Sequence, residues 1–135
     1  MSAKAFLEQV EKLDVLIHNK LIEKQQWKDI ALGITAHMDG ERVQSSGAKD
    51  KLGSAVAKCV DIEAEIDSLI DKLIDTKKVV IQTIERLSSP TEYNILHMRY
   101  IQYIPLKDIA DEMGTSYTNV TTLHGRALKN IERML

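Results

Sequence analysis

The sequence has little of the material from which disulfide-bonded, metal-binding or β-sheet proteins are built. Its one cysteine, Cys59, excludes an internal disulfide, and no Cys or His residues stand at the spacing of a structural zinc site. Aromatic residues make up only 4% and there are two prolines, a composition that suits long helices better than a β-sandwich. No apolar run approaches the roughly 18 residues of a membrane span, and the N-terminus lacks the apolar core of a signal peptide. We therefore expect a soluble all-α protein of the cytoplasm, with no metal, cofactor or membrane partner.

The sequence also lacks a pattern that would support catalysis. Cys59 stands on an apolar helical seam, where a small core residue is expected rather than a nucleophile. His18 and His97 stand singly in predicted helices, and His37 stands in the predicted loop. The acidic run at 61–71 alternates around a helix and is followed by lysines, as on a solvated face. We do not expect an enzyme.

Two helices and a loop are predicted before residue 88. Apolar residues at three- and four-residue steps predict a helix from about Ser2 to Ile34. Glycines and serines then predict a loop over residues 35–54, of which about 35–51 separates the two helices. This loop is either a plain connection or a contact surface for a partner.

The second helix, from about Asp50 to Leu87, has the spacing of a coiled coil. Its apolar residues repeat at alternating steps of three and four over about five heptads. We expect an antiparallel hairpin with the first helix, in which the seam also serves a second chain. The seam predicted to mediate this oligomerisation consists of Val56, Cys59, Ile66, Ile70, Leu73, Val80 and Ile84.

Three short helices are predicted after residue 88, at about 90–101, 105–113 and 116–134. The first begins at the capping box Ser89-Pro90-Thr91-Glu92, with proline at the first helical position. Together these helices define a second domain, residues 88–135, after the hairpin domain of residues 1–87.

The last two helices have the spacing of a helix-turn-helix. A small residue lets the two helices cross closely, glycine supplies the positive φ of a tight turn, and apolar residues fill the shared core. The predicted core consists of Ile109, Ala110, Met113, Gly114, Val120 and Leu123.

The second of these helices would then be the recognition helix, whose N-terminal half reaches base edges in the major groove of DNA. The residues placed to read bases are Tyr117, Thr118, Thr121 and Thr122. The residues placed for phosphates or for the flanks of the helix are Ser116, Asn119, His124, Arg126 and Lys129. Charge supports this only mildly, because residues 88–135 hold five basic and five acidic side chains. A single copy should bind DNA weakly, and dimerisation would raise the affinity by linking two weakly binding domains.

Residues 84–131 resemble the fourth, −35-promoter-reading region of bacterial sigma factors. The resemblance is carried by Leu87 and Pro90, by "ILHMRY" at 95–100, by "IADEMGTS" at 109–116, and by Val120 and "RAL" at 126–128. Sigma region four usually carries Arg, Glu and Gln on its recognition face, where this sequence has Tyr and Thr. The −35 specificity therefore does not carry over, and nothing matches the parts of a sigma factor that melt DNA.

The full length resembles a family of small phage- and prophage-encoded, sigma-like regulators, similar in layout to activators of phage late genes. The matching features are "AKAFLEQVEKLD", "ITAHMDGERVQSSGAKDKLG" and "RYIQY…LHGRAL". The resemblance implies a transcriptional regulator in a bacterial host cell, with double-stranded DNA and RNA polymerase as partners. Two alternatives stay open: a module that binds RNA polymerase or another protein with little DNA reading, and a DNA-packaging adaptor similar to a small terminase subunit.

Overall fold

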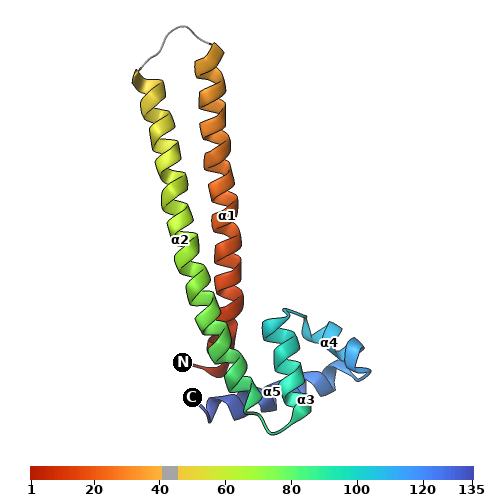
Figure 1. Cartoon of the computed structure of the whole chain (residues 1–135). Coiled ribbons are helices and arrows are strands. Elements are labelled where there is room, and N and C mark those ends of the chain that lie inside the picture. Colours follow the sequence, from red (N-terminus) through yellow and green to blue (C-terminus); the bar gives the residue numbers. More distant parts are fainter. Residues whose placement is uncertain (41–45) are drawn as a thin grey trace. The chain divides into compact units, whose positions relative to one another are not determined.

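The computed structural model describes the backbone of residues 1–40 and 46–135 and the side chains of residues 1–37 and 47–135. All its elements in this part are helices: α1 (Ala3–Gly40), α2 (Ser46–Glu85), α3 (Pro90–Leu96), the π-helix η1 (His97–Ile101), α4 (Leu106–Met113) and α5 (Tyr117–Glu132). Helices α1 and α2 form a long antiparallel hairpin, and a smaller helical group follows (Figure 1). The predicted all-α fold is confirmed.

The loop predicted at 35–54 is wrong over most of its length. Helix α1 continues to Gly40 and α2 already begins at Ser46, while residues 41–45 lie outside the described part of the chain. Gly53 stands inside α2, where glycine costs about 1 kcal/mol relative to alanine. Ala55, two residues later, is buried, so packing of α2 outweighs that local preference for a turn.

The chain divides into two compact units that cut across both long helices. Residues 1–14 and 72–135 form the first unit, and residues 15–71 form the second. The predicted domains divided the chain at residue 87 instead. In the structure the first turns of α1 and the last turns of α2 belong to the same unit as α3, α4 and α5.

The first unit is built around a core to which both ends of the chain contribute. Its buried residues come from the start of α1, the end of α2, α3, η1 and α5: Ala3, Leu7, Val10, Val80, Ile84, Leu87, Leu96, Tyr100, Ala127 and Ile131. Helix α1 begins here because the Ser2 hydroxyl accepts a hydrogen bond from the backbone N–H of Ala5, at 3.1 Å. The N-terminal segment is therefore part of the core beneath the C-terminal helices.

The second unit is a two-helix hairpin whose seam is only partly apolar. Ile17, Ala55, Ile62 and Ile66 are buried in it. On α1 the buried line continues through two half-buried lysines, and their ammonium groups reach acidic residues of α2. Lys20 Nζ lies 2.9 Å from Glu65 Oε2, and Lys24 Nζ lies 3.7 Å from Glu63 Oε1. The pairing raises the pKa of Lys20 and lowers that of Glu65.

The oligomer seam predicted on α2 needs correction. Ile66, Val80 and Ile84 are buried within a single chain, so they are not available to a second copy. Cys59 and Leu73 are half-buried, whereas Val56 and Ile70 are exposed. The line that faces inward consists of Leu52, Ala55, Cys59, Ile62, Ile66, Leu69, Leu73 and Val80. Apolar residues occupy two adjacent faces of α2, and the predicted seam mixed them.

The C-terminal helices begin and end close to the predicted residues, with one local difference. The predicted helix 90–101 changes at His97 into a π-helix, which closes with a bond from Gln102 N–H to the His97 carbonyl. The Ser89 hydroxyl caps α3 by accepting from the Glu92 N–H. The Glu92 carboxylate is buried and accepts from Asn130 Nδ2, at 3.1 Å, which ties α3 to α5.

Candidate nucleic-acid interface

The turn between α4 and α5 is tight and has a capped exit. Helix α4 ends at Gly114, whose φ of 65° and ψ of 35° lie in the left-handed region that favours glycine. Two residues later the Ser116 hydroxyl accepts a hydrogen bond from the Asn119 N–H, at 3.1 Å. This N-cap starts α5 immediately after the turn.

A separate apolar cluster holds α4 against α5. Ile95, Met98, Ile109, Ala110 and Val120 are buried in it. The partly buried residues that pack against this cluster are Ile104, Leu106, Met113 and Leu123. Five of the six residues that the sequence assigns to the shared core of a helix-turn-helix therefore lie together, with α3 and η1 as a third wall, whereas Gly114 is exposed at the turn.

The N-terminal half of α5 exposes three of the four side chains predicted to read bases. Tyr117 is 55% exposed, Thr118 and Thr122 are exposed, and Thr121 is half-buried. The hydroxyls of Thr121 and Thr122 both donate to the Thr118 carbonyl, at 2.8 and 2.9 Å. Each oxygen can still accept a bond. In this state the two hydroxyls can act only as acceptors toward a partner.

Basic residues continue this surface toward the C-terminus of α5. Arg126 and Lys129 are exposed on successive turns, and Arg133 follows them, with its guanidinium 3.4 Å from Asn130 Oδ1. Asn119 lies at the start of the helix, and its amide donates to the Thr115 hydroxyl at 3.0 Å. Small polar residues thus come first along α5 and cations follow.

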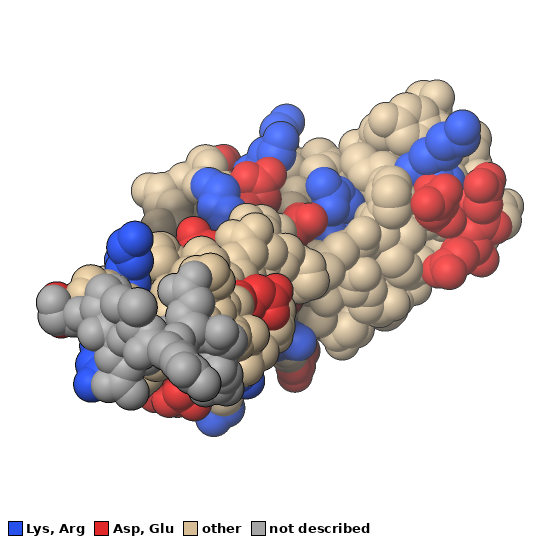
Figure 2. Space-filling view, turned by 90° about the horizontal axis from the view of Figure 1, so that it is seen from above, with Lys and Arg blue, Asp and Glu red and all other residues tan. Residues whose placement is uncertain are grey.

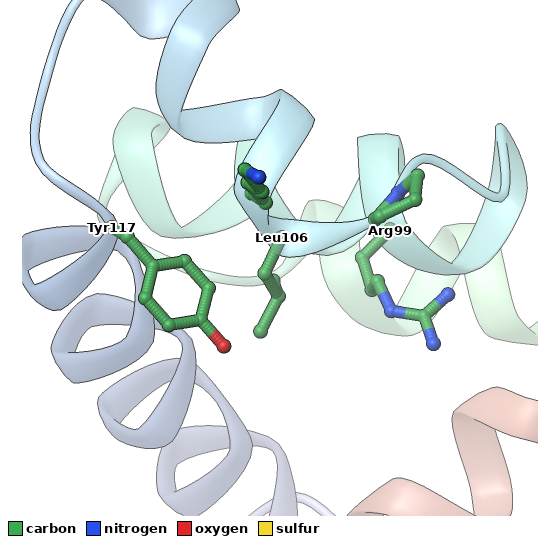
Figure 3. A pocket seen from close by; sticks show the side chains of 5 residues that line it. Arg99, Leu106 and Tyr117 are labelled. Carbon is green, nitrogen blue, oxygen red and sulfur yellow. The ribbon is translucent and has the colours of Figure 1, made fainter.

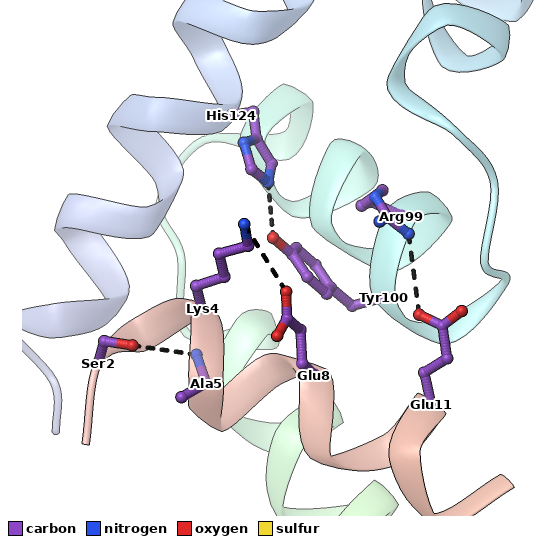
Figure 4. A network of polar contacts seen from close by, with 8 residues as sticks. All are labelled: Ser2, Lys4, Ala5, Glu8, Glu11, Arg99, Tyr100 and His124. Atoms are coloured by element: carbon purple, nitrogen blue, oxygen red, sulfur yellow. Dashed lines mark hydrogen bonds and ion pairs between the residues drawn. The ribbon is translucent and has the colours of Figure 1, made fainter. Parts of the chain in front are cut away.

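His124 occupies a different place from the other residues predicted to contact the DNA backbone. Its Nε2 lies 2.8 Å from the Tyr100 hydroxyl and its ring stacks on Tyr100, with ring centres 5.7 Å apart (Figure 4). Burial, and then the charges of Arg99 and Lys4, lower the pKa of His124. Burial raises the pKa of Tyr100 to about 12. The neutral imidazole therefore joins α5 to η1, which weighs against a role in phosphate binding.

A pocket beside the N-terminal half of α5 is lined by two cations, Arg99 and Lys107, that were not predicted from the sequence. It has a volume of about 530 Å³ and is lined by Arg99, Pro105, Leu106, Lys107 and Tyr117. Tyr117 and Leu106 lie side by side, with Arg99 on the far side of Leu106 (Figure 3). Arg99 Nη1 is also 3.9 Å from Glu11 Oε2, and its guanidinium carbon lies 5.5 Å from the centre of the Tyr100 ring. The sequence does hold one signal for this pair: Arg99 precedes and Lys107 follows Pro105, the residue that caps the start of α4.

One face of the molecule carries charges of both signs (Figure 2). On the face shown in Figure 2, lysines and arginines are interspersed with acidic residues and do not gather into one patch. Among the described residues no group of three or more His, Cys, Asp or Glu is placed to hold a metal ion. No helix in that part of the chain is long and apolar enough to cross a membrane.

Comparison with known proteins places the chain in a family but gives it no activity. Residues 32–132 match the family described as "Protein of unknown function (DUF1492)", and the chain belongs to this family. No curated protein matches the sequence, and no solved structure matches it.

Proposed function

We propose that this member of the DUF1492 family is a sequence-specific, double-stranded-DNA-binding regulator of transcription. Its resemblance to phage- and prophage-encoded sigma-like proteins suggests phage late genes as the target, with activation as the mode of regulation. It needs no cofactor for this role, and two or more copies act together.

The observation that carries the proposal is the geometry of α4, the turn and α5. Gly114 closes α4 in the left-handed conformation and the Ser116 hydroxyl starts α5 at once. The exposed N-terminal half of α5 then presents Tyr117, Thr118 and Thr122. A recognition helix contacts bases from this half when it enters the major groove. Threonine offers a hydroxyl to base edges and a methyl group to thymine.

The phosphate contacts would come from the two sides of α5. Arg126 and Lys129 extend the surface of α5 itself, and the pocket adds Lys107 and Arg99. The exposed Lys107 lies in the first turn of α4, whose free N–H groups favour an anion as well. Few phosphates are neutralised by so few cations, so a single copy binds weakly.

A second candidate function is suggested by the lining of the same pocket. Pro105, Leu106 and Tyr117 make part of it apolar, which suits a protein segment better than a phosphate. In that case the helix-turn-helix binds RNA polymerase or another protein, and DNA reading is secondary.

The test is the salt dependence of binding to a labelled mixed-sequence duplex, measured by fluorescence anisotropy. Arg126→Ala and Lys107→Ala should each weaken binding and reduce the slope of log K against log salt by about 1 for each phosphate that is no longer neutralised. Lys12→Ala removes an exposed lysine of α1 and serves as the control of equal charge.

The proposal predicts an unchanged slope for the Lys12 variant. If all three variants behave alike, the charge of the whole protein and not this surface governs binding. If the wild-type protein binds no duplex but binds purified RNA polymerase, and Tyr117→Ala abolishes that interaction, the second candidate is correct.

A further inference from the structure

Exposed apolar side chains gather on the second unit, residues 15–71. Four of them form a band along one side of its two helices, which we call the side stripe: Leu21, Leu32, Val56 and Val60. They are between 48% and 63% exposed. Isolated exposed apolar residues are ordinary, but residues aligned along a helical face indicate a contact surface.

The ion pairs of the hairpin show that both halves of the side stripe lie on the same side. Lys24 on α1 pairs with Glu63 on α2. Leu21 stands one turn before Lys24, and Val60 stands one turn before Glu63. The Lys20–Glu65 pair marks the opposite side. Together the two pairs place residues 27–29 of α1 at the level of about residue 58 of α2.

At this level the stripe is complementary to itself under a two-fold rotation. An axis between Val56 and Val60 brings Val56 of one copy opposite Val60 of the other, with the α2 helices antiparallel. The same axis brings Leu21 opposite Leu32 on α1. Polar residues on the same two helical faces are also paired by this rotation: Lys49 of one copy lies opposite Asp67 of the other, and Gln25 lies opposite Lys28. All these residues repeat at steps of three and four, as at a second coiled-coil seam.

We infer that the side stripe is the contact between two copies of this chain, which associate through their second units as an antiparallel four-helix bundle. Two properties of the second unit indicate that the side stripe is covered by a second copy of this chain. Apolar residues meet apolar ones and Lys49 meets Asp67 in the same register, a coincidence that an unrelated partner would not require. The lysines in the hairpin's own seam also leave the two helices with little buried apolar surface, which a symmetric partner would increase.

This contact differs from the oligomer seam expected from the sequence, since Ile66, Val80 and Ile84 take no part in it. It also goes beyond the proposed function, because it requires no DNA. A monomer that binds DNA would overturn the contact and the joint action of two copies, but not DNA reading. A dimer that binds no DNA would overturn only the proposed regulator.

The first experiment measures the mass of the full chain by light scattering and sedimentation equilibrium over a range of concentrations. Val60→Asp should weaken the dimer about tenfold or more, since it places a charge in the apolar centre of the contact. Val79→Asp is the matched control: Val79 is also on α2 and 52% exposed, but stands two heptads after Glu65, on the other side. Both sites are exposed, so both variants should keep the helical content of the wild type.

The wild type and Val79→Asp should be dimers and Val60→Asp a monomer. A wild type that stays monomeric at high concentration, or a Val79 variant that dissociates as readily as the Val60 variant, would overturn the contact. So would a wild-type mass above that of a dimer, because a two-fold pairing is closed.

The second experiment reverses charges to test the register. Asp67→Lys should weaken the dimer by placing two lysines opposite each other, and adding Lys49→Asp should restore it. If the double variant is as weak as the single one, Lys49 does not face Asp67.

A third experiment tests orientation in a Cys59→Ser background. Oxidation of an equimolar mixture of Val56→Cys and Val60→Cys should give mainly the mixed disulfide, whereas a parallel pairing would give the two homodimeric ones.

Discussion

The two units of the chain use their apolar residues in opposite ways. In the first unit, Leu7, Ile84, Leu96 and Ile131 are fully buried. In the second unit Val15, Leu16, Leu21, Ile22, Ile30, Leu32, Val56, Val60 and Ile70 remain exposed. The first unit has a large buried core, although Ile74, Val79 and Leu135 remain exposed, whereas most of the exposed large apolar residues lie on the second unit. A helix-turn-helix held by a complete core can present polar residues outward, whereas a two-helix hairpin can bury only one side of each helix.

The largest loss of stability should come from a substitution in the core of the first unit at α1, the segment farthest in sequence from the C-terminal helices. Leu7 lies in α1 but has no exposed surface and packs in the cluster with Leu96 and Ile131. Leu7→Ala should lower the free energy of unfolding by about 2–5 kcal/mol. Leu32→Ala, at a position 63% exposed, should have a much smaller effect in dilute protein. Chemical denaturation checks the pair, with Trp27 fluorescence and helical circular dichroism as readouts. Equal losses would contradict the division of the core.

Two glycines of the helix-turn-helix, Gly114 and Gly125, differ in their backbone conformation. A Cβ added at Gly114 or Gly125 meets no atom within 4 Å, so only the backbone conformation distinguishes them. Gly114→Ala should destabilise the fold by about 1–2 kcal/mol, because its φ is positive. Gly125→Ala lies inside α5 and should stabilise the fold by up to about 1 kcal/mol. Thermal unfolding measures both signs. If the Gly125 variant is more stable yet binds DNA less well, the backbone of α5 approaches DNA closely at that point.

A smaller effect is expected from pH in the first unit. His124 is buried against Tyr100, and burial with Arg99 and Lys4 lowers its pKa below the usual 6.5. The unfolded chain therefore takes up a proton at higher pH than the folded one, so stability is full above pH 6.5 and falls as the pH drops further. His124→Gln should remove this part of the loss. Unfolding free energies of both proteins between pH 5 and 8 test the sign, and identical pH profiles would contradict the burial of a neutral imidazole.

How much the sequence predicted differs between the same two regions. The C-terminal helices follow from local signals, because Ser89, Gly114 and Ser116 each act within a few residues of where they stand. The contribution of Leu7 to their core could not be read locally, since it depends on contacts across the whole length of the chain. The seam of α2 was placed on mixed faces because Val56 and Ala55 are both apolar. Periodicity shows that a helix is amphipathic but not which of two apolar faces meets its neighbour.

The candidate site was predictable where one helix defines it and missed where several elements meet. Tyr117, Thr118 and Thr122 are exposed at the start of α5, the position that the helix-turn-helix spacing assigns to them. Arg99 was not predicted as part of it, because its approach to Lys107 and Tyr117 depends on how η1 leads into α4. His124 was assigned to the DNA backbone because it lies on α5, but in the structure its ring bonds Tyr100. Nothing in the sequence connects these two residues.

The most direct test of the DNA-reading claim is selection of bound fragments from the source genome, including any prophage, at near-physiological salt. The wild-type protein would be run beside Thr121→Ala/Thr122→Ala, which removes two hydroxyls that donate to the Thr118 carbonyl of their own helix and should leave the fold intact. We expect the wild type to enrich one intergenic site, and the double variant to bind that site more weakly by about 1–3 kcal/mol for each base that these threonines read. No enrichment by the folded wild-type protein, or the same enrichment by both proteins, would contradict the claim that α5 reads DNA through these residues.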